Sequence, residues 1–310
     1  MTFEIESIEY QLGEEPILVR DLCIRNNRNF ERLIVRSGFE TVHHTNLSEE
    51  LFFSNFLKNN FKTNPGDFII FVNQSMTEII PGKISRIFSD FLNVDKVFFI
   101  ELSDGCSGFV RALVIADALL QSKNTTKVHI ICAEKYSKYY LEADESVSPI
   151  FSDAISLTTL RKGKKYNLVS TAVKNSLSNS KLISTSLNSN HQLKLNMDGG
   201  SVLSWALSTI PEIIGELLMS ANVERKDVNY WFLHQGSKVV VEMLTERIGL
   251  VGQDLFKATN VGNTVSSSIP IIWKQVIESN ENVMSPGEIM VLAGFGVGLS
   301  AIAACIKIES

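Results

Sequence analysis

The chain has 310 residues, a formal net charge of −5 and 45% hydrophobic residues. A chain of this length can bury a large core and favours two domains or two similar halves. The mild negative charge excludes the basic surface that nucleic-acid binding needs. The four cysteines are scattered and lack the paired spacing of metal ligands, so we expect no metal site. No charged segment followed by an apolar core opens the chain, so we expect a protein of the reducing cytoplasm. We expect no cofactor.

The first half of the chain alternates strands and helices. Residues 66–73, 97–102 and 127–132 are apolar runs rich in β-forming residues, which predict buried strands. A helix is expected around residues 83–92, after a polar turn. Residues 111–121 consist mostly of Ala, Leu, Val and Ile and predict a largely buried helix. This alternation is typical of a parallel sheet covered by helices.

The middle of the chain is polar. Around residues 160–166 the sequence turns basic, and a stretch rich in Ser and Asn follows as far as residue 190. We expect a solvated connector here, with a basic docking site for an acidic partner as the alternative. The chain is therefore divided into an N-terminal half, residues 1–165, and a C-terminal half, residues 166–310.

The second half has its own alternation of elements. Residues 201–222 are predicted as helical with an interruption at Pro211, which suits the first turn of a second helix. Residues 230–233 form an aromatic strand, and residues 238–248 and 269–279 are predicted helices. The two halves thus share a strand–helix pattern without an obvious sequence repeat, which suggests a duplicated α/β fold.

One apolar run has the length of a membrane-spanning helix. Residues 289–306 carry no charge over 18 residues. The run contains Gly294, Gly296 and Gly298, however, so we predict two buried strands joined by a glycine turn and no membrane span.

Cys106 lies where the strand 97–102 gives way to a helix, among small residues. Unpaired N–H groups and the positive end of the dipole at a helix start favour a thiolate, so a nucleophilic cysteine fits this position. The alternative is a structural cysteine, because cysteines are commonly buried. A nucleophile would also need a base elsewhere in the chain.

Three later segments offer polar groups near strand ends or helix starts. His234 follows the aromatic strand, at the edge where α/β sheets place their sites, whereas His129 lies within an apolar strand and is expected to be packed. Asn263 follows Gly262 and precedes small hydroxyl residues, so its amide either faces a cavity or belongs to a plain turn. The glycine-rich run 294–298 can aim a backbone N–H at an anionic oxygen, or form a tight hairpin.

Taken together, these segments resemble the β-ketoacyl-acyl carrier protein synthase III family, condensing enzymes of the thiolase superfamily. The resemblance extends over nearly the whole chain. It rests on ordered motifs at residues 104–109 (DGCSGF), 233–235 (LHQ), 262–264 (GNT) through 269–270 (IP), and 294–298 (GFGVG), with further matches at 36–38 (RSG), 197–199 (MDG) and 286–288 (PGE).

The resemblance implies a thiolase-like five-layered αβαβα fold from two pseudo-duplicated halves, usually a homodimer. Cys106 would be the acyl-accepting nucleophile. His234 and Asn263 would hold the carbonyl of a malonyl-type extender while it loses carbon dioxide. The backbone N–H groups of Cys106 and Val297 would stabilise the oxyanion of the condensation step. The implied partners are acyl carrier protein and acyl and malonyl thioesters, with coenzyme A as another possible carrier.

The chain departs from the family pattern at positions that contact the substrate or its carrier. Arg32 stands where members that use acyl-coenzyme A commonly have Trp, and Glu145 stands where they have Arg; that pair usually sandwiches the adenine. Ser237 replaces an Asn, Lys238 lies beside a position often used for carrier docking, and Arg36 is a further candidate contact. We therefore expect the reaction type to hold and the substrate to be specialised, as in polyketide or modified fatty-acid synthesis.

Three other functions use part of this pattern. An acyltransferase that passes the Cys106 acyl group to an alcohol or amine would not need both His234 and Asn263. A subunit of a heterodimeric synthase would often lack the cysteine. A Cys-His-Asn hydrolase uses the same residue types, but the Cys-Gly-Ser-Cys-Trp signature of papain-like proteases is absent.

Overall fold

The computed structural model describes residues 2–25, 29–75, 87–88, 97–139, 150–187, 193–279 and 284–310. The helix expected around residues 83–92 lies outside these ranges except for residues 87–88, which are helical. The other predicted helices and strands named above fall within them.

Nine strands form one hydrogen-bonded sheet in the order β11-β12-β13-β8-β1-β7-β6-β4-β5. Their bounds are β1 (Thr2–Leu12), β4 (Phe68–Val72), β5 (Phe98–Leu102), β6 (Lys127–Glu134), β7 (Ala154–Lys162), β8 (Tyr166–Asn175), β11 (Tyr230–Leu233), β12 (Ile289–Gly296) and β13 (Ser300–Ile308). The predicted strands of both halves, including the antiparallel pair β12 and β13 around the glycine turn, are confirmed.

The strand order repeats within the sheet. β4 and β6 are parallel, and β7 and β1 continue the row antiparallel. β11 and β12 are likewise parallel, and β13 and β8 continue antiparallel. The two rows join only where Thr2 and Phe3 of β1 pair with Asn167 and Tyr166 of β8. This repeat supports the division after residue 165, which we propose as the boundary between the halves.

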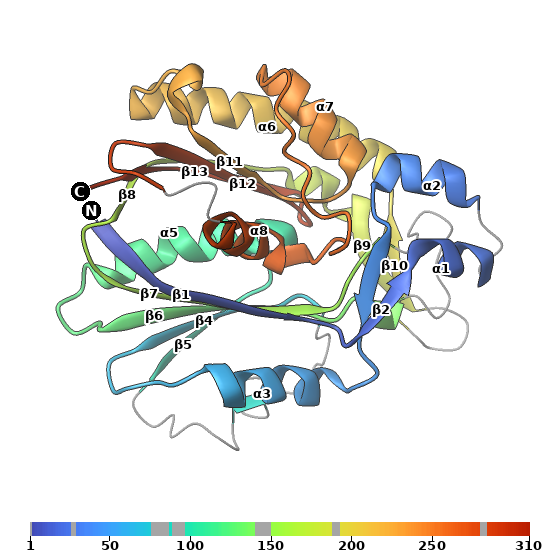
Figure 1. Cartoon of the computed structure of the whole chain (residues 1–310), viewed down its shortest axis with the longest axis horizontal. Helices are drawn as coiled ribbons and strands as arrows, with labels where there is room; N and C mark the ends of the chain where they lie inside the picture. Colours follow the sequence, from blue (N-terminus) through green and yellow to red (C-terminus); the bar gives the residue numbers. More distant parts are fainter. Residues whose placement is uncertain are drawn as a thin grey trace.

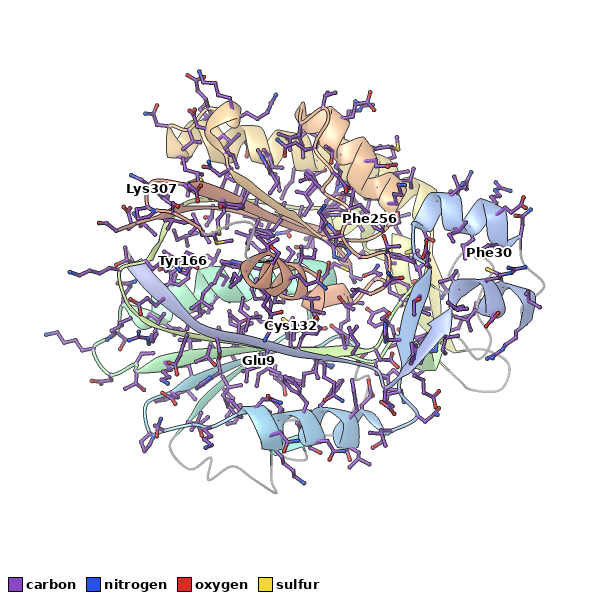
Figure 2. The ribbon with its side chains drawn as sticks, viewed as in Figure 1. Glu9, Phe30, Cys132, Tyr166, Phe256 and Lys307 are labelled. Atoms are coloured by element: carbon purple, nitrogen blue, oxygen red, sulfur yellow. The ribbon has the colours of Figure 1, made fainter. Side chains whose placement is uncertain are left out.

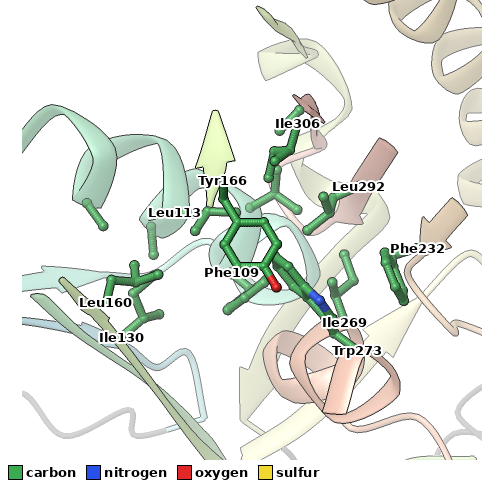
Figure 3. Close-up of a cluster of buried hydrophobic side chains, with 14 of the residues drawn as sticks. Phe109, Leu113, Ile130, Leu160, Tyr166, Phe232, Ile269, Trp273, Leu292 and Ile306 are labelled. Atoms are coloured by element: carbon green, nitrogen blue, oxygen red, sulfur yellow. The ribbon is translucent and has the colours of Figure 1, made fainter. Parts of the chain in front are cut away.

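Helices separate and cover the two rows of strands (Figure 1). α5 (Gly108–Leu120) and α8 (Ser268–Glu278) lie between them, α6 (Gly199–Ala221) and α7 (Lys238–Ile248) cover one outer face, and α3 (Glu49–Asn60) covers the other. The predicted five-layered αβαβα architecture is confirmed. Figure 3 shows Phe109 of α5 and Trp273 of α8 meeting strand residues such as Leu292 in the central core.

The remaining elements lie at one end of the layers (Figure 1). They are α1 (Val19–Arg25), α2 (Phe30–Ser37) and two small antiparallel sheets of two strands each, β2 (Glu15–Leu18) with β3 (Thr41–His44) and β9 (Ile183–Leu187) with β10 (Leu193–Met197). Short 3₁₀ turns are η2 (Gly105–Ser107), η3 (Ser137–Tyr139), η4 (Leu177–Leu182), η5 (Arg225–Asp227) and η6 (Val265–Ser267). Figure 2 shows side chains filling the space between these elements, with Phe256 beneath α2.

The predicted interruption of the helix at Pro211 is wrong, because α6 runs unbroken through it. A proline inside a helix removes one hydrogen bond and costs about 3 kcal/mol. The apolar face continues on both sides of the proline and buries Ile210, Ile214 and Leu217 against the sheet. α6 is also the one helix among the described residues with the length and composition of a membrane span, but one of its faces packs on the sheet.

The predicted solvated connector is also wrong. Of the basic residues, Arg161 and Lys162 end β7, and Lys164 and Lys165 lie in the tight turn to β8, which is an inner strand between β1 and β13. Its polar residues misled the prediction because one face of β8 is exposed, whereas Ser170 on the other face donates its Oγ–H to the carbonyl of Leu217 in α6 (3.0 Å). The Ser- and Asn-rich stretch beyond β8 contains β9, which pairs with β10 after it.

Candidate active site

Cys106 lies in the short turn η2, between the end of β5 and the start of α5. Two glycines of β12 allow this turn to approach the sheet. A Cβ atom on Gly296 would lie 3.0 Å from Cys106 Cβ and 3.2 Å from its Sγ, and one on Gly294 would lie 2.7 Å from the Cys106 carbonyl oxygen. A small residue of the Cys106 segment itself also allows close packing, because a Cβ on Gly108 would lie 2.3 Å from Val72 Cγ1.

The electrostatics of Cys106 differ from the prediction. It is the one cysteine of the four that is not fully buried. Burial in the apolar site raises the pKa of its thiol, and the carboxylate of Glu134 raises it further. The start of α5 therefore does not produce a low pKa, contrary to the expectation that a helix start favours the thiolate. The desolvation of the charged sulfur outweighs the helix dipole here.

His234 follows β11 and is fixed by its backbone N–H, which donates to the carbonyl of Ala293 (2.9 Å). Its ring lies edge-on to Phe295, with 5.5 Å between ring centroids. Nδ1 has no hydrogen-bond partner among the described residues. Burial lowers the pKa of His234 to about 3, so the imidazole is neutral near pH 7 and carries one N–H donor. His129, by contrast, bonds Thr159 (3.1 Å) inside the core, as expected of a packed residue.

Asn263 is held on both its backbone and its side chain. Its N–H donates to the carbonyl of Ile150 (2.8 Å), and its carbonyl accepts from Ser152 (2.9 Å). Its Oδ1 accepts from the N–H of Val265 (2.9 Å), which leaves Nδ2 as a donor with only a long contact to the Gly236 carbonyl (3.5 Å). Val265 has a φ of +52°, a conformation that costs about 1–3 kcal/mol for such a residue and occurs often at functional sites.

These side chains converge on one cavity of about 290 Å³. Cys106, His234, Asn263 and Val297 all line it, although they come from four separate segments. The rest of the lining is mainly apolar, with Tyr136, Ile150, Phe151, Ile183, Leu195, Met197, Val202, Leu203, Ala206, Val239, Val240, Val265 and Phe295 among its members. An apolar lining of this kind strengthens the hydrogen bonds that the protein makes to a substrate inside the cavity.

Two of the predicted contact residues line this cavity, and two do not. Arg36 of α2 and Ser237, which caps α7 by accepting from the N–H of Val240, belong to the lining. Arg32 and Lys238 are exposed and are not among the lining residues. Glu145 lies outside the described residues.

The lining residues on α2 and α7 have basic neighbours. Arg32 and Arg36 are four residues apart on α2 and therefore share one face of it. The two helices pack together, because a Cβ on Gly38 would lie 2.4 Å from Lys238 Cβ. Lys238 contacts Glu242 at 3.8 Å, and both side chains are largely exposed.

The sequence analysis missed Glu134, a fully buried carboxyl at the end of β6. It accepts hydrogen bonds from the backbone N–H groups of Gln74 (3.1 Å) and Ser75 (2.8 Å) and from Ser266 Oγ (3.2 Å). Burial raises its pKa to about 7, although these donors act in the opposite direction. The signal was present, because a charged residue at the carboxyl end of a buried strand lies at the edge where such sheets place their sites.

A cysteine at a helix start between two repeated rows of strands, together with a neutral His and an Asn in one apolar cavity, defines a thiolase-fold acyltransferase. Residues 100–176 match the family profile of 3-oxoacyl-[acyl-carrier-protein (ACP)] synthase III, and residues 218–308 match the profile of its C-terminal part. The chain belongs to the 3-oxoacyl-[acyl-carrier-protein] synthase III family, and the predicted family and enzyme class are confirmed.

Individual relatives agree with this assignment. A β-ketoacyl-[acyl-carrier-protein] synthase III of Streptococcus agalactiae is 26% identical over 261 residues, which cover 81% of this chain and 80% of the relative. The structure of 3-oxoacyl-[acyl-carrier-protein] synthase III from Aquifex aeolicus has a TM-score of 0.85 at 21% identity and covers 99% and 100% of the two chains. The priming β-ketosynthase of the R1128 polyketide pathway has a TM-score of 0.84 at 17% identity, covering 99% and 96%, and shares the fold.

Proposed function

We propose that the protein joins an acyl primer carried on Cys106 to a malonyl-type thioester by decarboxylative Claisen condensation. One observation carries the proposal: Cys106, His234 and Asn263 line the same apolar cavity, and both polar partners are neutral hydrogen-bond donors. A charged partner would stabilise the malonyl carboxylate before it leaves, whereas neutral donors act on the enolate oxygen as its charge develops.

The first half-reaction loads the primer. The Cys106 sulfur attacks the thioester carbonyl, the bond to the carrier sulfur breaks, and the thiol proton ends on the released carrier thiol. Because the proton is passed on in this way, no permanent thiolate is required. This agrees with the raised pKa of Cys106 in its apolar surroundings.

The second half-reaction forms the carbon–carbon bond. The malonyl carboxylate leaves as carbon dioxide, and the electron pair passes into an enolate whose oxygen accepts from His234 and Asn263. The enolate carbon attacks the acyl carbonyl on Cys106, and the resulting oxyanion accepts from the backbone N–H groups of Cys106 and Val297. Collapse of this intermediate breaks the bond to sulfur, and the Cys106 thiolate that leaves takes up a proton from water to restore the thiol.

Acyl carrier protein is the partner that we propose. Arg36 lies in the cavity lining, and Arg32 and Lys238 are exposed on the same two packed helices, which suits an acidic carrier. Glu145, at a position that the family resemblance gives to the adenine, would repel the phosphates of coenzyme A. The test compares kcat/KM for the same acyl group carried by acyl carrier protein and by coenzyme A. Equal or better use of acyl-coenzyme A would contradict the proposal.

A homodimer is the proposed assembly. β5 is the last strand of the described sheet, and its Phe98 is 59% exposed while stacked on Phe68 at 4.6 Å. An edge strand that carries an exposed aromatic side chain is suited to pairing with a second chain. Sedimentation of the wild type and of Phe98→Lys tests the dimer, and a monomeric wild type would contradict it.

All four cysteines are free, which fits the cytoplasmic setting that we propose.

The reaction is tested by intact-mass measurement. Incubation with acyl thioesters should add one acyl group to the wild type and none to Cys106→Ala. Addition of malonyl-acyl carrier protein should then restore the unmodified mass, with release of carbon dioxide and a β-ketoacyl product. Transfer of the acyl group to an alcohol or amine without carbon dioxide would favour the non-condensing alternative.

A further inference from the structure

A second cavity, of about 180 Å³, adjoins the one that contains Cys106. The two share Tyr136, Ile183, Leu195 and Val297 as lining residues. Val297 is also the residue whose N–H is proposed to hold the oxyanion. The second cavity therefore begins where the acyl group on Cys106 would extend.

The walls of the two cavities differ in chemistry. The first is mainly apolar, whereas five of the eight residues that line the second have polar side-chain groups. These five are Gln74, Tyr136, Tyr139, Ser184 and Thr185. A cavity built for a plain alkyl chain would be apolar, because burying polar groups without partners costs free energy.

Gln74 lies beside the turn that carries the nucleophile. Its backbone N–H is fixed by the carboxylate of Glu134. Its Oε1 accepts from the Tyr136 hydroxyl (2.9 Å), and a Cβ on Gly105, the residue before Cys106, would lie 2.5 Å from this oxygen. The same hydrogen bond orients the amide, and its Nε2 makes no hydrogen bond with the described residues. One amide donor is therefore left for a ligand.

The two tyrosines add acceptors to this wall. The Tyr136 hydroxyl donates to Gln74, and the Tyr139 hydroxyl donates to the Ser75 carbonyl (3.1 Å), so each phenol oxygen keeps lone pairs for another donor. Burial and the charge of Glu134 raise the pKa of both phenols, which keeps them neutral. The wall thus offers a donor and acceptors side by side, without charge.

We propose that this second cavity receives the far end of the primer, and that Gln74 selects an acyl group with a hydroxyl or keto oxygen over a plain alkyl group of equal length. The inference rests on the proposed function, since it presumes an acyl group on Cys106. The cavity of about 180 Å³ holds roughly six groups the size of a water molecule, at about 30 Å³ each, which suits a short primer. An alkyl primer would leave the Gln74 donor unpaired, whereas an oxygenated primer satisfies it.

The test compares rates of Cys106 acylation, followed by intact mass, for 3-hydroxybutanoyl, 3-oxobutanoyl and butanoyl groups on the same carrier. In the wild type, both oxygenated groups should load at least ~10-fold faster than butanoyl. Gln74→Met, which keeps the volume and removes the donor, should bring both rates close to that of butanoyl. The matched control is Gln121→Met at the exposed end of α5, which should retain the wild-type preference.

A second variant keeps the test decisive if Gln74→Met does not fold. Gln74→Glu retains acceptors and removes the donor, so the hydroxyl primer should keep an advantage that the keto primer loses. Equal or faster loading of butanoyl by the wild type would overturn the inference and leave the proposed function standing, as would an unchanged preference in both variants. Failure of every thioester to acylate Cys106 would overturn the proposed function and this inference with it.

Discussion

Glu134 and His234 are both buried titratable residues at the ends of strands, yet their surroundings differ. The Glu134 carboxylate accepts from two backbone N–H groups and a hydroxyl, all from neighbouring segments. The His234 ring lines the cavity that contains Cys106, and its Nδ1 has no partner among the described residues. Burial disfavours the charged form of each, which raises the pKa of Glu134 to about 7 and lowers that of His234 to about 3.

The contrast separates a structural role from a chemical one. A buried polar group whose partners lie within the protein holds segments together, as Glu134 ties the residues after β4 to η6. A buried polar group that faces a cavity without such partners is available to a ligand. Glu134 still reaches the chemistry indirectly, because its charge raises the pKa of Cys106.

Replacing His234 or Asn263, which are proposed to hold the enolate oxygen, should have the largest effect on the rate of condensation. We expect His234→Ala and Asn263→Ala each to slow condensation by ~100–1000-fold, or about 3–4 kcal/mol, because each variant loses a donor to the enolate oxygen. Acylation of Cys106 should persist in both. Glu134→Gln, which keeps most of the hydrogen bonds, should condense within a few-fold of the wild type. Carbon dioxide release and intact mass separate the two steps, and undiminished condensation in Asn263→Ala would favour plain acyl transfer.

Removing the Glu134 carboxylate should change the free energy of unfolding by an amount that depends on pH. Between its ordinary pKa of 4.5 and the raised value of about 7, Glu134 binds more protons in the folded than in the unfolded state, so its contribution to stability falls as the pH rises. The loss is complete above pH 7 and amounts to about 3 kcal/mol.

Glu134→Gln should therefore gain stability relative to the wild type from pH 4.5 to 7 and hold that gain above pH 7. Urea unfolding at several pH values measures the difference between the two proteins. Glu216→Gln, on the exposed side of α6, is the control and should show no such trend. A difference that stays flat with pH would mean that Glu134 ionises normally.

Local sequence patterns predicted many of the strands and part of the candidate site. Apolar runs identified β4, β5, β6, β11 and the pair β12 and β13, and the ordered motifs pointed to Cys106, His234 and Asn263, which line one cavity. It missed effects that depend on distant segments. Pro211 is tolerated because α6 packs on the sheet, and the pKa of Cys106 is set by burial and by a carboxylate 28 positions further along the chain. The polar wall formed by Gln74 and Tyr136 likewise joins residues that no local pattern connects.

The link between Glu134 and Cys106 can be measured by alkylation. Without the carboxylate charge, the pKa of the Cys106 thiol should fall, and a fall of one unit corresponds to about tenfold more thiolate and faster labelling by iodoacetamide. Peptide mapping across a pH series should show the profile of Glu134→Gln shifted to lower pH. Cys106 should be the labelled residue in both proteins, because the other three cysteines are buried. Coincident profiles would show that the carboxylate does not act on the thiol.

The smallest expected effect concerns the space around His234. A Cβ on Gly236 would lie 3.4 Å from His234 Nε2, an ordinary contact, whereas a Cβ on Gly296 would lie 3.0 Å from Cys106 Cβ and 3.2 Å from its Sγ. Gly236→Ala should therefore condense within about threefold of the wild type and gain about 0.4–1 kcal/mol of stability, because alanine restricts the unfolded chain. Gly296→Ala should displace Cys106 and slow acylation far more. Thermal unfolding and single-turnover rates of the two variants test this pair. A large loss of condensation in Gly236→Ala, with acylation intact, would mean that the His234 ring needs the empty space beside it to reach the enolate.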